Sequence, residues 1–179
     1  QQPGTFPAVN LRLWHQSGPK SGLCTGVNCR FNYIIQETFM SLNLSTKIRA
    51  VALVGHGAVG KTTLVESLLA ATGAITSRGA VEKGNTVCDF DPVEKQLGHS
   101  LQSALVSLNT PDALIHMIDT PGYPDFAGQA IGALAAVDTA LVVISAQTGI
   151  ELSTERMFQL AGERGLCRMI VINKIDADN

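Results

Sequence analysis

Short apolar runs alternate with helical patterns along most of the chain. The alternation begins near Arg49, after a start that has neither the period of a strand nor that of a helix. It predicts strands over residues 50–54, 101–108, 113–118, 140–145 and 168–172, and helices over 61–72, 127–136 and 151–164. This order is typical of an α/β fold, in which helices cover both faces of a mostly parallel sheet.

Two of the predicted strands form a hairpin. Asn109-Thr110-Pro111-Asp112 separates residues 101–108 from residues 113–118, and Pro and Asp at such positions favour a tight turn. We therefore expect one antiparallel strand in the sheet. Gly73 follows the first predicted helix and is expected to cap its end.

Residues 1–39 contain three prolines and several glycines and show no sustained period. They are interpreted as a disordered leader or upstream extension, and Met40, where the pattern changes, is a candidate natural start. Residues 40–179 are expected to form one domain, incomplete at its C-terminus, because a strand and a helix of such a fold should still follow. We expect apolar sheet surface to be exposed there.

The composition of the chain gives no sign of DNA, a membrane or zinc as a partner. The chain has 179 residues, a hydrophobic fraction of 45% and a formal net charge of −2, which suits one globular domain and gives no sign of a DNA-binding surface. No apolar run is long enough to span a membrane, and no signal peptide is visible. The four cysteines, at positions 24, 29, 88 and 167, lack zinc-ligand spacing. These features predict a cytoplasmic protein with reduced thiols.

A glycine-rich motif, Gly55-His56-Gly57-Ala58-Val59-Gly60-Lys61-Thr62, follows the first predicted strand and opens the first helix. It matches the phosphate-binding loop (P-loop) pattern G-x-x-x-x-G-K-[ST] in the required context, and so predicts a P-loop NTPase fold. Backbone amides would surround phosphate oxygens, Lys61 would contact the β- and γ-phosphates, and Thr62 would bind Mg²⁺. The alternative, a glycine-rich turn without a ligand, gives the Lys-Thr pair no purpose.

A carboxylate, Asp119, follows the strand over 113–118 and opens the sequence Asp119-Thr120-Pro121-Gly122. Ligands of open α/β sheets bind at the carboxyl ends of the strands. Asp119 is therefore expected to hold Mg²⁺ through a water, and the amide of Gly122 to approach the γ-phosphate. A surface turn of the same sequence is the alternative.

Asn173-Lys174-Ile175-Asp176 follows the last predicted strand. The Asp176 carboxylate can accept two hydrogen bonds from guanine, whereas adenine would leave it unpaired. Lys174 would lie over the base and Asn173 would tie this loop to the P-loop. The full set of expected GTP-binding residues is Gly55, His56, Gly57, Ala58, Val59, Gly60, Lys61, Thr62, Thr63, Asp119, Gly122, Asn173, Lys174 and Asp176.

With these motifs, residues 50–179 resemble the translational GTPases. The residues between the first helix and the hairpin, among them Gly79, Thr86, Asp89 and Glu94, follow the spacing of elongation factor G, and residues 119–126 resemble its second switch. The resemblance implies that the full protein is a multidomain GTPase that uses GTP and Mg²⁺ and acts on the ribosome. It also implies that Ser100 completes the Mg²⁺ shell. We also expect a monomer, and the composition predicts no DNA or membrane partner.

The chain departs from this family at three places. Where the first switch usually ends in Arg-Gly-Ile-Thr-Ile, residues 97–101 are Leu-Gly-His-Ser-Leu. Ala58 replaces an Asp of the P-loop, and Tyr123 replaces the His that positions the attacking water. Tyr123 either packs on the P-loop or takes over this catalytic role, with hydrolysis weakened or differently triggered. His56 is read as a structural residue, and His99 as a solvated one.

Three functions remain open. The first is Mg²⁺-dependent GTP hydrolysis, with Lys61 and Tyr123 as catalytic residues, coupled to ordering of residues 79–100 and 119–126 in a ribosomal translocation factor. The second is a GTP-gated ribosome-binding protein with little or no hydrolysis, which Tyr123 and Ala58 favour. An ATP-using enzyme is the third, and Asp176 disfavours it.

Overall fold

A five-stranded sheet in the order β2-β3-β1-β4-β5 forms the centre of the domain. A computed structural model describes residues 47–176, so the predictions for residues 1–39 and for Met40 lie outside the described residues. The strands are β1 (Ile48–Val54), β2 (Ala104–Asn109), β3 (Leu114–Asp119), β4 (Thr139–Ser145) and β5 (Cys167–Asn173). Each lies within a few residues of its predicted position.

The sheet is parallel except at one edge. β1 pairs in parallel with β3 and β4, β4 pairs in parallel with β5, and only β2 runs antiparallel, against β3. The predicted hairpin is thus confirmed, and its turn is closed by hydrogen bonds between Thr110 and Ala113. Leu53 of β1 lies beside Asp119 of β3 and Leu141 of β4, so β1 and β3 end almost together, whereas β4 continues to Ser145.

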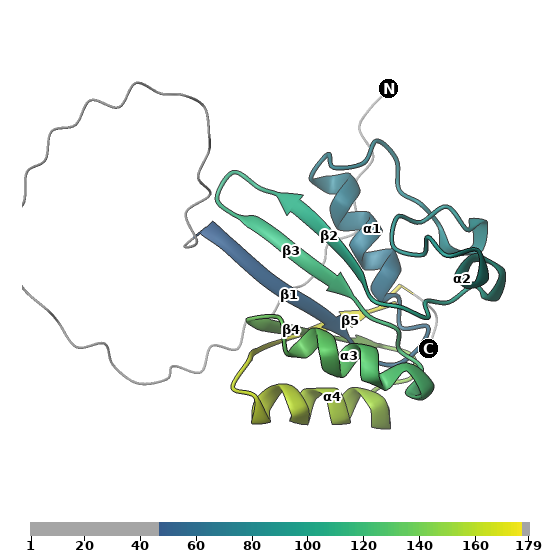
Figure 1. Cartoon of the computed structure of the whole chain (residues 1–179). Coiled ribbons are helices and arrows are strands. Elements are labelled where there is room, and N and C mark those ends of the chain that lie inside the picture. The colour runs from purple at the N-terminus through teal and green to yellow at the C-terminus, as the bar shows by residue number, and fades with distance from the viewer. Residues whose placement is uncertain (1–46, 177–179) are drawn as a thin grey trace, which may run out of the picture.

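Helices cover both faces of this sheet, as expected (Figure 1). On one face α1 (Lys61–Ala71) packs through Val65 and Leu69 against a core that includes Leu53 and Val143. On the other face α3 (Ala127–Leu134) and α4 (Leu152–Glu163) cover β1, β4 and β5. The alternating inward side chains of β1 therefore supply two separate cores.

The first helix ends where the sequence places its cap. Thr72 is the last residue with helical geometry, and Gly73 has a φ of +72°, in the left-handed region that glycine favours. The amides of Gly73 and Ala74 donate to the carbonyls of Ala70 and Leu69, which closes the helix end.

Short helical segments interrupt the long polar stretch before β2, where the sequence pattern predicts none. They are the 3₁₀ turn η2 (Val81–Lys83) and the helix α2 (Pro92–Leu97); a third, η3 (Pro124–Phe126), lies just before α3. α2 has a full capping box, in which Asp91 accepts from the amide of Val93 and Glu94 accepts from that of Asp91.

The edge strand β5 leaves apolar surface uncovered. The side chains of Ile170 and Ile172 are 46% and 60% exposed, in agreement with the expected exposure of apolar surface on the sheet. Both cysteines in the described part of the chain, Cys88 and Cys167, are free thiols. Within residues 47–176, no helix has the length and apolarity that a membrane crossing requires.

Candidate functional site

The predicted site residues come together at the carboxyl end of the sheet. The P-loop follows β1, Asp119 ends β3, and Asn173 ends β5, and these three strands are parallel. A pocket at this end is lined by the P-loop, by the segment between α1 and β2, by residues 120–123 and by Lys174. The structure therefore assembles all three motifs around one pocket.

The P-loop can adopt its path only because of its glycines. Gly55 has a φ of +145°, and a Cβ atom there would lie 2.4 Å from the carbonyl oxygen of Val143. Gly60 has a φ of +93°, and a Cβ atom there would lie 2.4 Å from Nδ2 of Asn173. Ala58 also has a positive φ, +58°, which costs an alanine free energy.

Lys61 is buried at the start of α1 and points back into the P-loop. Its Nζ donates to the carbonyl oxygens of Gly55, at 3.1 Å, and of His56, at 2.7 Å. Burial lowers the pKa of Lys61 to about 8, against the opposing effect of Asp119. A Cβ atom on Gly122 would lie 2.3 Å from this Nζ, so glycine lets the two loops meet. The ammonium group is thus available to an anionic ligand of the loop.

Two hydroxyl groups meet beside the P-loop. Thr62 Oγ1 donates to Asp119 Oδ2 at 2.7 Å, and Ser100 Oγ donates to Asp89 Oδ1 at 2.6 Å. The two hydroxyl oxygens lie 3.3 Å apart. Because each proton points to a carboxylate, the lone pairs of both oxygens are left for a cation.

Asp119 is buried and incompletely paired. Burial raises the pKa of its carboxyl group to about 6, although the hydrogen bond from Thr62 and the charge of Lys61 oppose this rise. Its second oxygen, Oδ1, has no hydrogen-bond partner in the described part of the chain. A buried carboxylate oxygen without a partner is costly unless a cation or an ordered water pairs with it.

The third motif contacts the first. Nδ2 of Asn173 donates to the carbonyl oxygen of Val59 at 2.9 Å, which ties the end of β5 to the P-loop. Lys174 lines the pocket and has a φ of +58°. Asp176 follows in an exposed turn. Lys174 is therefore the residue of this motif that lines the pocket, and Asp176 is not among the lining residues.

Tyr123 packs on the P-loop. Its Cζ, Cε1 and Cε2 atoms lie 3.1–3.2 Å from the position that a Cβ atom on Gly57 would occupy. The ring of His99 lies beside that of Tyr123, with the two centroids 4.7 Å apart. His99 is half-buried and also lines the pocket.

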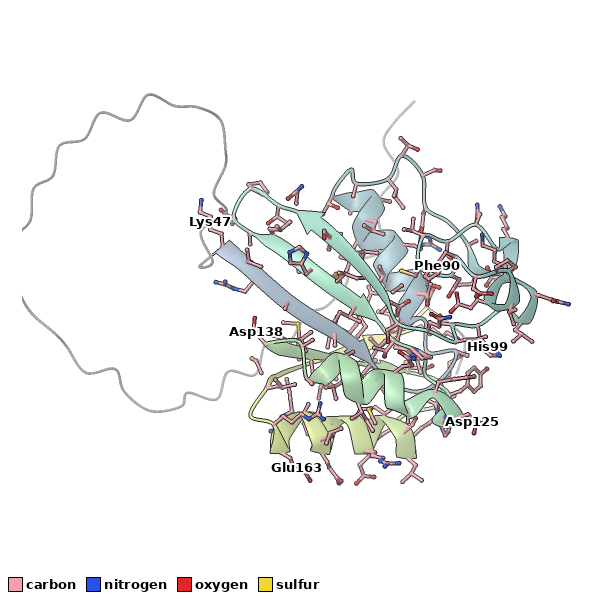
Figure 2. The ribbon with its side chains drawn as sticks, in the orientation of Figure 1. Lys47, Phe90, His99, Asp125, Asp138 and Glu163 are labelled. Atoms are coloured by element: carbon pink, nitrogen blue, oxygen red, sulfur yellow. The ribbon has the colours of Figure 1, made fainter. Side chains whose placement is uncertain are left out.

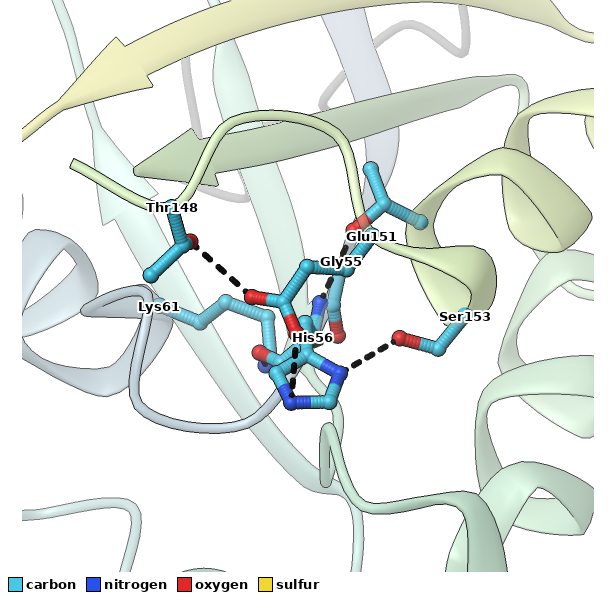
Figure 3. A network of polar contacts seen from close by, with 7 residues as sticks. Gly55, His56, Lys61, Thr148, Glu151 and Ser153 are labelled. Carbon is cyan, nitrogen blue, oxygen red and sulfur yellow. Dashed lines mark hydrogen bonds and ion pairs between the residues drawn. The ribbon is translucent and has the colours of Figure 1, made fainter. Parts of the chain in front are cut away.

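His56 joins the P-loop to α4. Its Nδ1 lies 2.8 Å from Ser153 Oγ, its Nε2 lies 2.9 Å from a Glu151 carboxylate oxygen, and its amide donates to Thr154 Oγ1 (Figure 3). Thr148 in turn donates to Glu151. These contacts agree with a structural role for His56, since they fix the loop from outside the pocket.

Two buried glutamates fix the segment between α1 and β2, and the sequence analysis missed their role. Glu66 of α1 accepts from the amides of Gly79 and Val87, and Glu94 of α2 accepts from those of Leu101 and Gln102. Glutamates are seldom fully buried without partners. The Asp91-Pro-x-Glu94 spacing was a readable sign of α2, but nothing in the sequence indicates the partners of Glu66.

Comparisons with known proteins agree with this geometry. The family model for the elongation factor Tu GTP binding domain matches residues 46–179. An elongation factor G-like protein of Mycobacterium tuberculosis is 41% identical over 129 residues, which are 72% of this chain and 18% of that protein. The mitochondrial ribosome-releasing factor 2 of Yarrowia lipolytica is 33% identical over 138 residues, which are 77% of this chain and 17% of that protein.

A solved structure from Thermus thermophilus is also similar, with a TM-score of 0.69 and 44% sequence identity over 70% of this chain and 19% of that one. The chain therefore spans about a fifth of the length of the relatives that it matches. The family model covers residues 46–179, and the P-loop and the order of the strands agree with it. The chain belongs to the elongation factor Tu-type GTP-binding domains of the translational GTPase family.

Proposed function

We propose that this chain is the nucleotide switch of an elongation factor G-like protein that binds and hydrolyses GTP on the ribosome. The observation that carries the proposal is the meeting of Lys61, Thr62 and Lys174 at one pocket, with Asp119 hydrogen-bonded to Thr62 behind it. The name of the Yarrowia lipolytica relative refers to the ribosome, which supports the ribosome as the partner. We also propose that the protein is a monomer, that it acts in the cytoplasm, and that it has no DNA or membrane partner.

In this proposal the phosphates of GTP lie in the P-loop. The Lys61 ammonium leaves the carbonyl oxygens of Gly55 and His56 and contacts the β- and γ-phosphates, which attract it more strongly than neutral carbonyls do. The Gly122 amide approaches the γ-phosphate. Asp176 accepts two hydrogen bonds from the guanine base, and this pair selects GTP over ATP.

The residues present also fit Mg²⁺. Thr62 and Ser100 would hold the ion directly and Asp119 through a water, since their oxygens are adjacent and Asp119 Oδ1 lacks a partner among the described residues. The described residues contain no cluster of three or more His, Cys, Asp or Glu side chains able to hold a metal. The site therefore depends on phosphate oxygens and waters for its remaining ligands. When bound, the ion would neutralise charge that develops on the phosphates.

A second candidate is a GTP-gated ribosome-binding protein that hydrolyses little or no GTP. The packing of Tyr123 on Gly57 favours this second candidate. A ring held against the P-loop is not free to position the attacking water as the family's His does. Ala58, where the family has an Asp, favours it as well.

Release of phosphate from GTP by the intact protein, in Mg²⁺, with and without ribosomes, tests the proposal. Ribosome-stimulated release is the expected result. Tight GTP binding without release would replace the proposal by the gated binder. Binding of ATP in preference to GTP would overturn both.

A further inference from the structure

His99 and Tyr123 form an aromatic pair at the pocket. Their ring centroids are 4.7 Å apart and their planes are tilted by 54°. The pair joins two different segments, since His99 precedes β2 and Tyr123 follows β3. Figure 2 shows His99 at the end of the molecule toward which β1 and β3 point. Both rings line the pocket that also contains Lys61 and Gly122.

Tyr123 is the member of the pair that contacts the P-loop. The hydroxyl-bearing end of its ring is pressed against the backbone at Gly57. A larger residue than glycine at that position would displace the ring. The phenol is therefore a platform that the P-loop supports, and its contact with His99 orients the imidazole.

His99 can offer a nitrogen acceptor to the pocket. Its Nδ1 lies 3.5 Å from the carbonyl oxygen of Ser100, a long contact. A carbonyl can only accept, so this contact favours the tautomer that carries its proton on Nδ1. In that tautomer Nε2 is an acceptor, and a water in the pocket can donate to it.

We propose that His99 is the water-positioning residue for GTP hydrolysis in this protein, and that Tyr123 serves as its platform. In the reaction, the water oxygen bonds to the γ-phosphorus while the bond from that phosphorus to the β–γ bridging oxygen breaks. The electron pair of that bond leaves with GDP, and the protons of the water pass to phosphate and solvent. A hydrogen bond from this water to Nε2 orients its lone pair toward phosphorus.

This inference rests on the proposed function, and it reverses the assignment from the sequence. There Tyr123 was the catalytic residue and His99 a solvated one. The structure instead brings His99, on the segment that also carries Ser100, to the same pocket as Lys61 and Gly122.

Two substitutions of His99 distinguish its role as a hydrogen-bond acceptor from its role in packing against Tyr123. His99→Phe keeps an aromatic ring against Tyr123 but has no acceptor, whereas His99→Gln keeps an acceptor but has no ring. We expect kcat for ribosome-stimulated phosphate release to decrease from wild type to His99→Gln to His99→Phe. The loss in His99→Phe should be about 100-fold, typical of a misplaced reacting group, with a much smaller change in GTP affinity. His116→Phe, on the exposed surface of the β2–β3 pair, is the matched control and should behave like wild type.

The order of the two variants decides the inference. A kcat of His99→Phe equal to or above that of His99→Gln means that the ring only packs, and overturns it. Wild-type protein is measured first with ribosomes. If it releases no phosphate, the hydrolytic part of the proposed function fails and the inference fails with it. If it does release phosphate, the variants test the inference alone.

Discussion

The hydroxyl oxygens of Thr62 and Ser100 lie 3.3 Å apart, although 38 residues separate them in the chain. Two adjacent ligands of an octahedral Mg²⁺ ion, each about 2.0–2.1 Å from it, lie about 2.9 Å apart. A small inward movement of the segment that carries Ser100 would bring both oxygens to that spacing. The two oxygens are thus close to the spacing that the proposed Mg²⁺ site requires.

Thr62→Val should weaken the dependence of GTP binding on Mg²⁺, because valine keeps the shape of threonine but lacks the oxygen. We expect the Mg²⁺ concentration for half-maximal binding of a fluorescent GTP analogue to rise by about 10- to 100-fold. In EDTA the variant and wild type should bind alike. An unchanged Mg²⁺ titration would exclude Thr62 as a ligand.

Asp176→Asn should lower the affinity for GTP by on the order of 10³-fold, since the amide cannot accept both hydrogen bonds from guanine. The affinity for ATP should hardly change. Competition between the two nucleotides for the same pocket measures this difference. If both affinities fall together, Asp176 supports the loop and does not select the base.

The buried carboxyl of Asp119 makes stability depend on pH. Its pKa is raised from 3.8 to about 6 in the folded protein, mainly by burial, so the folded state holds this proton more tightly than the unfolded state does. That stabilising contribution is present below pH 4 and is lost as the pH rises toward 6, with a total of about 3 kcal/mol.

Asp119→Asn removes this contribution. In EDTA and without nucleotide, the free energy of unfolding of the variant minus that of wild type should therefore rise between pH 4 and pH 7. Urea unfolding at several pH values measures it. A difference that stays constant with pH would contradict a raised pKa.

Ala58→Gly should stabilise the nucleotide-free protein by about 0.5–1 kcal/mol, because alanine at a φ of +58° is strained and glycine is not. Gly73→Ala is the opposite change, at a φ of +72° with no atom close to the added methyl group. It should destabilise the protein by about 1 kcal/mol. Thermal unfolding should show a higher melting temperature for Ala58→Gly and a lower one for Gly73→Ala. A loss of stability in Ala58→Gly would contradict the backbone strain at Ala58.

Glu66→Gln should loosen the segment between α1 and β2. The amide cannot accept both backbone hydrogen bonds, from Gly79 and Val87, and leaves a buried donor unpaired. We expect a loss of about 1–3 kcal/mol and faster hydrogen exchange over residues 79–87. Glu163→Gln, on the exposed end of α4, serves as the control.

Much of the fold follows from the sequence, because apolar runs buried on both faces of a parallel sheet are easy to recognise. The antiparallel β2 was predictable from the turn at Pro111. The helix α2 has only six residues, too few to show a helical period, so its one sign in the sequence was the capping box of Asp91 and Glu94.

The site was predictable where residues adjacent in sequence act together, as in the P-loop. Contacts between residues far apart in the sequence were not predictable. Nothing local indicates that Ser100 donates to Asp89 or that His99 contacts Tyr123, because both contacts depend on how a long segment without regular period returns to the sheet.

The central place of β1 has a consequence for synthesis on the ribosome. β1 is the first strand made among the described residues, yet both of its partners, β3 and β4, come later in the chain. Its first neighbour, β3, is complete only at Asp119, about 65 residues after Val54, which takes roughly 3–13 s at typical elongation rates. Throughout that interval the apolar strand IRAVALV lacks both of its neighbours in the sheet.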